Sequence, residues 1–273
     1  MRASLNRGKP LDSTTQVVTT LIIVAAAAAS LILTQFARRR RGLFPVRAIA
    51  AYDLIPTMVG NAIEAGNPIH MSIGSAGLGG MDTPLTLAVT DLLYEVSRRA
   101  ATGSVAPIFT LSNTTALPLA YSTLRRAYRS RGRLERLDSA SVRWFPAGTR
   151  SLAFAAALTG VMGYERVTGN VLVGSFGAEL ALALDKAARR QNVIAASNQL
   201  EGQAAAWALA DYPLIGEEAF VGGAYLNPDS AGRRAAVRTL DLLRWALIIG
   251  LLVAAANTLR EPVAEALQRL LGG

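Results

Sequence analysis

The chain has 273 residues, a formal net charge of +9 and no cysteine. The absence of cysteine excludes disulfide bonds, thiolate metal sites and a cysteine nucleophile, and the single histidine, His70, argues against a histidine-cluster metal site. Nearly all of the basic excess is arginine, which suggests an anionic partner such as nucleic acid, anionic lipid or an anionic small ligand.

Two strongly apolar segments lie near the ends of the chain. After a short polar tail, residues 1–16, the segment Val17–Phe36 carries no charge, and as a helix it would be about 30 Å long, which matches the hydrocarbon core of a bilayer. Arg38–Arg41 follow directly, as is typical of the cytoplasmic end of a span. We therefore predict a transmembrane helix over 17–37 with the N-terminus outside. A cleaved signal peptide is the alternative, because small residues occupy positions 25–30.

The second apolar segment, Trp245–Ala256, is short for a span and is extended to 240–259 in the predicted transmembrane helix. A buried helix of a soluble domain is the alternative. Arginines precede this segment, so the positive-inside rule places the intervening domain, 45–229, in the cytoplasm. The tail, 260–273, is amphipathic and is expected outside. The predicted localisation is the cell membrane, as a multi-pass protein.

Between the apolar segments, short strand-like runs alternate with helical patterns. Strands are predicted at 68–73, 105–111, 142–145, 167–173 and 193–196, and helices at 54–64, 84–99, 117–131, 151–162, 178–190 and 203–210. This alternation implies an α/β fold with an open, mostly parallel, Rossmann-like sheet. The stretch Pro213–Pro228 is expected to be irregular, and residues 222–226 fit either a short strand or a docking loop.

Glycine-rich or polar turns follow the predicted strands. Because the carboxyl ends of parallel strands share one edge of the sheet, where α/β proteins bind ligands, these turns predict a pocket for a nucleotide or another anionic small ligand. The candidate ligand-binding residues are Gly74, Ser75, Gly77, Gly79, Gly80, Ser112, Asn113, Arg150, Ser175, Gly177, Glu179 and Asn198. Tight packing at the glycines and helix capping by the polar side chains explain the same residues without a ligand.

Three side chains have competing interpretations. Arg150 is the cation best placed to meet an anion at this edge, or it is a surface residue or an ion-pair partner of Glu179. Glu179 either hydrogen-bonds a ligand or caps its own helix. His70 lies mid-strand among apolar residues, which favours a hydrogen-bonded core histidine over a general base. The sequence identifies no catalytic set, no metal site and no cofactor other than the nucleotide.

Ten arginines occur from Arg98 to Arg150, and the acidic residues Glu135 and Asp138 lie among them. Such a cluster suits an anionic lipid leaflet, a nucleic acid, a solvated helix face or salt bridges between subunits. A membrane-tethered domain makes lipid phosphate the simplest partner and disfavours nucleic acid.

Several motifs together resemble an uncharacterised family of membrane-anchored α/β domains of unknown function. They are Pro68-x-His70, the Gly74–Gly80 turn, Gly174-x-x-Gly177-x-Glu179 and the flanking hydrophobic segments, over residues 48–229. The resemblance implies this architecture and no established activity.

Three functions are compatible with these features. The first is a membrane-anchored structural or scaffolding protein that forms homo-oligomers through its cytoplasmic domain and contacts other membrane proteins; small residues four apart, Ala246, Gly250 and Ala254, favour close helix packing. The second is a membrane-tethered sensor or binding module for a nucleotide or other anionic ligand. An enzyme comes third, because acids and bases are few and scattered.

Overall fold

The computed structural model describes residues 48–188 and 192–227, with a few isolated positions at 24, 28, 32, 245, 246 and 248–250. No helix within these residues has both the length and the apolar character that crossing a bilayer requires. Both predicted spans, 17–37 and 240–259, lie outside the described residues except at those isolated positions, as do both tails. The α/β unit, Val46–Asp229, forms a compact body of its own.

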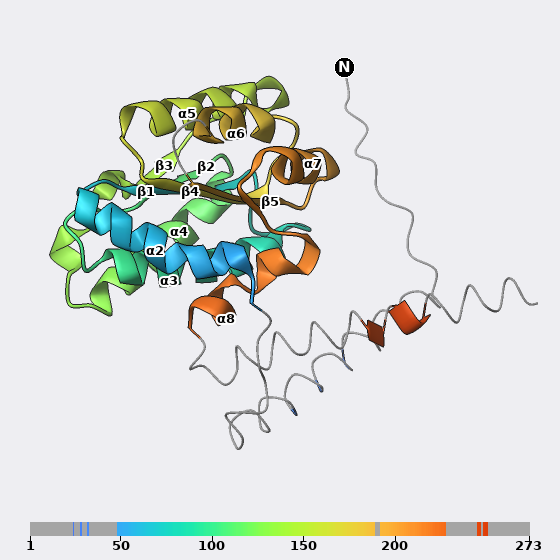
Figure 1. Ribbon diagram of the computed structural model, residues 1–273, viewed down its shortest axis with the longest axis horizontal. Coiled ribbons are helices and arrows are strands. Elements are labelled where there is room, and N and C mark those ends of the chain that lie inside the picture. Colours follow the sequence, from blue (N-terminus) through green and yellow to red (C-terminus); the bar gives the residue numbers. More distant parts are fainter. Residues whose placement is uncertain are drawn as a thin grey trace, which may run out of the picture. The chain divides into compact units, whose positions relative to one another are not determined.

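Strands and helices alternate along this unit (Figure 1). The strands are β1 (Ile69–Gly74), β2 (Ile108–Leu111), β3 (Val142–Trp144), β4 (Gly169–Ser175), β5 (Asn192–Ser197) and β6 (Tyr212–Pro213). The α-helices are α2 (Ala50–Ala65), α3 (Thr83–Ala100), α4 (Leu117–Arg129), α5 (Leu152–Tyr164), α6 (Leu180–Ala188), α7 (Leu200–Leu209) and α8 (Gly222–Leu226). Short 3-10 helices occupy Thr114–Ala116, Leu134–Arg136, Ser139–Ser141, Thr149–Ser151 and Gly216–Phe220.

The strands form one parallel sheet in the order β3-β2-β1-β4-β5-β6. This is the strand order of a Rossmann-type sheet. Figure 1 shows α5, α6 and α7 over one face of the sheet and α2, α3, α4 and α8 over the other. The predicted α/β class and the parallel, Rossmann-like sheet are confirmed.

Helices on both faces explain the apolar character of the central strands. Every residue of β1 and β4 is buried, as expected of a parallel sheet covered on both sides. On one side, Phe154 and Leu158 of α5 pack with Leu172 of β4. On the other, α4 buries Leu124 and exposes Arg125, which reflects its amphipathic sequence.

The structure corrects the C-terminal part of the predicted fold. Residues 222–226 form the short helix α8, which is neither a strand nor a loop. The strand β6 pairs with β5 and ends at Pro213, the first residue of the stretch expected to be irregular. In addition, β2 begins three residues later than predicted, because Pro107 has no N–H group for the strand ladder.

The first and last helices of the unit lie side by side against α3. Tyr52 of α2 stacks on Tyr225 of α8, and its hydroxyl donates a hydrogen bond of 2.6 Å to the carbonyl of Glu218. Burial raises the pKa of Tyr52, so the hydroxyl remains a donor at any physiological pH. The chain therefore enters and leaves the α/β unit at neighbouring positions.

Candidate functional site

The strand order reverses between β1 and β4, which makes the carboxyl ends of these strands the switch point of the sheet. The loops after the two strands diverge at such a point, and α/β proteins bind ligands in the crevice between them. The candidate residues of the two loops, 74–80 and 175–179, meet here. Sequence reasoning placed both groups at one edge, and the structure brings them to adjacent strands.

Direct backbone contact joins the two loops. The N–H and the hydroxyl of Ser75 both donate to the carbonyl oxygen of Ser175, at 2.8 and 3.0 Å. Gly74 has a φ of 63°, and a Cβ there would lie 2.2 Å from the same oxygen. A Cβ at Gly174 would lie 2.1 Å from the Ile73 carbonyl. Packing between β1 and β4 therefore requires both glycines, whether or not a ligand binds.

Backbone amides in these loops are hydrogen-bonded within the protein. The hydroxyl of Thr83 accepts from the N–H groups of Gly79 and Gly80, at 3.0 and 3.2 Å, and the hydroxyl of Thr115 accepts from Leu78 N at 2.8 Å. A phosphate cradle needs such amides free to bind the anion. Hydrogen bonding within the chain therefore disfavours the Gly74–Gly80 turn as a preformed phosphate site.

The loop after β2 also reaches the switch point. The Asn113 side-chain amide donates to the Ser75 carbonyl at 3.2 Å, and the Ser112 hydroxyl donates to the Gly74 carbonyl, also at 3.2 Å. A Cβ at Gly77 would lie 2.1 Å from Asn113 Nδ2. These candidate residues do come together, and they brace the first loop.

The loop after β5 closes the edge on its other side. Asn198 Nδ2 donates to Asp82 Oδ1 at 2.6 Å, and Gln199 Nε2 donates to the Ser175 hydroxyl at 2.9 Å. Sequence reasoning missed Asp82 and Gln199 as members of this network. Asp82 immediately precedes α3, which suggested only a helix start, so no sequence signal distinguished it as a bridge between loops.

Glu179 forms a hydrogen bond within its own segment, in line with the second of the two interpretations given for it above. Its Oε1 accepts from Gly177 N at 2.9 Å, two residues earlier in the chain. Arg150 is exposed in the 3-10 helix Thr149–Ser151, which leads from β3 into α5. Within the described part of the chain, no ion pair joins it to Glu179 and no hydrogen bond joins it to another candidate residue. The structure thus shows no direct contact between Arg150 and the network of the other candidate residues.

His70 is the hydrogen-bonded core histidine that the sequence favours. It is fully buried in β1, between Asn170 of β4 and Thr110 of β2, with 2.9 Å from Nδ1 to Asn170 Oδ1 and from Nε2 to Thr110 Oγ1. Burial lowers its pKa to about 4, although the Asn170 hydrogen bond opposes the shift. A neutral, buried imidazole without access to solvent is suited to holding three strands in register.

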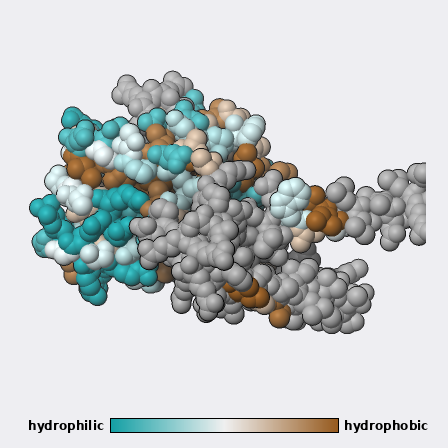
Figure 2. Space-filling model, turned by 60° about the horizontal axis from the view of Figure 1, so that its bottom comes forward, coloured by the Kyte–Doolittle hydropathy of each residue, from teal (hydrophilic) through white to brown (hydrophobic). Residues whose placement is uncertain are grey.

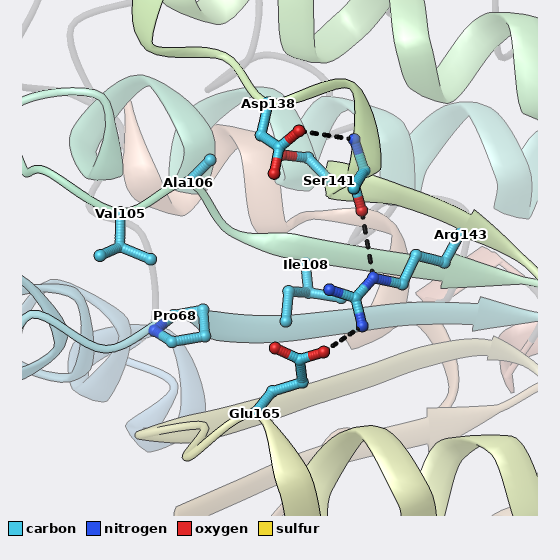
Figure 3. Close-up of a pocket in the computed structure, with 9 residues that line it drawn as sticks. Pro68, Val105, Ala106, Ile108, Asp138, Ser141, Arg143 and Glu165 are labelled. Atoms are coloured by element: carbon cyan, nitrogen blue, oxygen red, sulfur yellow. Dashed lines mark hydrogen bonds and ion pairs between the residues drawn. The ribbon is translucent and has the colours of Figure 1, made fainter.

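A pocket of about 170 Å³ lies at the opposite, amino-terminal edge of the sheet (Figure 3). Arg143 lies beside it, donating to Glu165 Oε1 at 2.5 Å and to the Ala140 carbonyl at 3.1 Å. Asp138 lines the pocket too, and its carboxylate accepts from Ala140 N at 2.9 Å. The charged groups around this pocket are therefore engaged with the protein itself.

The polar carboxyl edge is chemically suited to holding loops together. Its groups are mostly neutral amides, hydroxyls and carbonyls, and Asp82 and Glu179 contribute the carboxylates. Among the described residues, no three His, Asp or Glu side chains converge as metal ligands would. The geometry presents a cross-linked sheet edge with exposed glycines at positions 79 and 80.

Comparison with known proteins gives a family and no function. Searches among curated proteins and among solved structures returned no match to this chain. A model of a family described as a domain of unknown function (DUF6754) matches residues 10–266, nearly the whole chain. The match agrees with the resemblance to an uncharacterised family inferred from the glycine turns. The chain belongs to this family of domains of unknown function.

Proposed function

We propose that this protein is a membrane-anchored scaffold whose copies assemble through the outer face of α5, α6 and α7. Membrane anchoring is supported by the apolar segments Val17–Phe36 and Trp245–Ala256, within the predicted spans 17–37 and 240–259, and by the arginines beside them. Assembly is supported mainly by the apolar character of an outward-facing helical layer.

The α5–α7 layer presents large apolar side chains to its surroundings. From Leu152 to Tyr164, α5 contains no charged residue. Tyr164 is 90% exposed on α5, and Leu200 and Trp207 are 87% and 64% exposed on α7. Leu182 of α6 is also exposed, and α6 packs between α5 and α7. A helix that is apolar on both sides, as α5 is, is normally buried, so we expect this exposed layer to bind a partner.

Gly160 gives a second, independent indication on the same layer. It lies inside α5, where glycine is less favourable than alanine by about 1 kcal/mol. A Cβ at this position would meet nothing within 4 Å. The single chain therefore has no packing need for glycine here, whereas a neighbouring helix crossing α5 closely would require a small residue.

A second copy of the chain is the occupant that we propose for this face. The chain leaves the described unit from α8, in the opposite helical layer, so the α5–α7 layer is directed away from that point (Figure 1). The outer side of α5, which is uncharged and includes the small exposed residues Ala153 and Ala156, can pack on its copy about a two-fold axis. Such an isologous contact would link copies held in the same membrane.

The proposal is tested by measuring the mass of the full-length protein in mild detergent, using light scattering with size exclusion. Wild type is expected as a dimer or larger, and Gly160→Arg, which projects a charge from the middle of this face, as a monomer with an unchanged melting temperature. The matched control is Ser122→Arg, at an exposed position on α4 in the opposite layer, and it should retain the wild-type mass. A monomeric wild type, or equal effects of the two variants, would overturn the proposal.

A nucleotide-binding or anion-binding module is the second candidate. The reversal of strand order between β1 and β4 favours this function. Gly79 and Gly80 also favour it, because both are exposed and a Cβ added at either would meet nothing within 4 Å, which leaves room for a ligand. This function would be favoured over scaffolding if the protein were a monomer and its melting temperature rose when one nucleotide was added. Gly80→Trp should abolish that rise.

A further inference from the structure

An arginine-rich surface covers the end of the unit formed by α4 and the turn after it. We use the term arginine surface for Arg125, Arg126, Arg129, Arg131, Arg133 and Arg136. All of these side chains are exposed except that of Arg133, which is half-buried. Hydrophilic residues gather at this end of the unit in Figure 2.

The contacts that position these arginines are mostly to neutral groups. The Arg126 guanidinium lies 4.6 Å from the centroid of the Tyr94 ring, Arg131 Nε donates to the Arg98 carbonyl at 3.2 Å, and Arg136 donates to the Gly103 carbonyl at 3.1 Å. Within the described chain, Arg125 and Arg129 pair with no carboxylate. The surface therefore holds several guanidinium groups in place without neutralising them.

This surface adjoins the place where the chain leaves the unit. Arg131 donates to the carbonyl of Arg98, in the last turn of α3. The residue after Arg98, Arg99, donates a hydrogen bond to the carbonyl of Leu226 in α8. Buried Glu95 accepts from both Arg98 and Asn227, at 2.8 and 3.2 Å. The predicted span at 240–259 starts soon after Asn227, the last described residue of the unit. Even if the chain between them were fully extended, the span would start at most about 45 Å from Asn227.

We infer that the arginine surface binds the phosphate headgroups of anionic lipids in the membrane that anchors the chain. Guanidinium groups bind phosphate through paired N–H donors, and basic residues close to a span are attracted to an anionic leaflet. A tether of this length allows these residues to reach lipid phosphates. The binding orients the α/β unit on the bilayer, and it is independent of assembly through α5–α7.

The absence of native cysteine allows a direct test with the full-length protein in lipid nanodiscs. A fluorescent donor on Ser130→Cys, within the arginine surface, reports transfer to an acceptor on lipid headgroups. Transfer should be higher in discs of equal parts phosphatidylglycerol and phosphatidylcholine than in discs of phosphatidylcholine alone. Adding about 0.5 M salt should remove the difference, because it shortens the Debye length to a few ångströms.

Two variants with the same loss of charge separate specific contact from net charge. Arg125→Ala/Arg129→Ala should lose the lipid-dependent difference, and Arg150→Ala/Arg166→Ala, at exposed arginines outside the surface, should keep it. Equal loss in both variants, or equal transfer in both kinds of disc, would overturn the inference. The inference would also be overturned if a labelled oligonucleotide bound the protein in phosphatidylcholine discs through Arg125 and Arg129. Such binding would identify nucleic acid as the partner. Near-ultraviolet circular dichroism checks that both variants are folded.

Discussion

His70 Nδ1 lies 2.9 Å from the Asn170 side-chain oxygen, so Nδ1 carries the proton and Nε2 accepts from the Thr110 hydroxyl. This arrangement links three central strands through side chains that are all fully buried. A one-residue shift of β1 would break both hydrogen bonds, and the same shift of β2 or β4 would break one, in each case leaving buried polar groups unpaired, which is costly. The histidine thus helps to specify the register of β2, β1 and β4.

Stability should fall as pH decreases from 6.5 to 4. The pKa of His70 is about 4 in the folded chain and about 6.5 when unfolded, so the unfolded state binds more protons between these values. The free energy of unfolding therefore loses about 3 kcal/mol across this window. His70→Gln should be less stable at pH 7 by about 1–3 kcal/mol but should lack this component. Melting temperatures across the window compare the two; a parallel decline in both would contradict the assignment.

Glu95→Ala should destabilise the unit by about 2–4 kcal/mol, because buried Glu95 holds Arg98 and Asn227 together and its loss leaves partly buried cations without their partner. Thermal melting in detergent measures the effect. Glu64→Ala, at an exposed glutamate of α2, should change stability by no more than about 0.5 kcal/mol. Similar losses in the two variants would show that Glu95 has no special role.

Gly223→Ala should loosen α8 from α3. A Cβ at Gly223 would lie 1.8 Å from Asp91 Oδ2, so the Asp91 side chain must rotate away or α8 must shift, at a cost of about 1–3 kcal/mol. The comparison is Gly160→Ala, which meets no atom and should stabilise α5 by up to about 1 kcal/mol. Hydrogen exchange of α8, measured by mass spectrometry, should be faster only in the first variant.

The predicted topology can be tested with single introduced cysteines, because the chain has no native cysteine. In intact cells, a membrane-impermeant maleimide should label Ser4→Cys and should label Ser122→Cys only after lysis. Labelling of both positions before lysis would place the α/β unit outside. Loss of the label together with a shorter mass would instead identify 17–37 as a cleaved signal peptide.

Periodicity in the sequence was sufficient to predict five strands and the helices between them, because β1, β2, β4 and β5 are runs of mostly buried residues and the helices bury one side. It could not predict β6, whose two residues, Tyr212 and Pro213, are too few for any period. It also missed α8, since Gly222-Gly223 is typical of a turn. Contacts with Tyr52 and Asp91, distant in the sequence, stabilise this helix instead.

The candidate site was predicted in its location but not in its internal contacts. Parallel strands place their carboxyl ends at one edge, so Ser75, Asn113, Ser175 and Asn198 could be grouped from the sequence. Which groups bond to one another depends on the lateral order of the strands. That order brings β4 beside β1, where the Ser175 carbonyl accepts hydrogen bonds from the Ser75 hydroxyl and N–H.

The contact between α2 and α8 also determines how the α/β unit can be exchanged. A body whose two ends meet can be inserted into a loop between two helices without forcing those helices apart. Residues 48–227 should therefore be replaceable by another small domain with adjacent termini, such as a reporter, and the unit should tolerate circular permutation at a loop elsewhere. In evolutionary terms, such a body can be acquired or lost by a single insertion or deletion in a loop of a host protein.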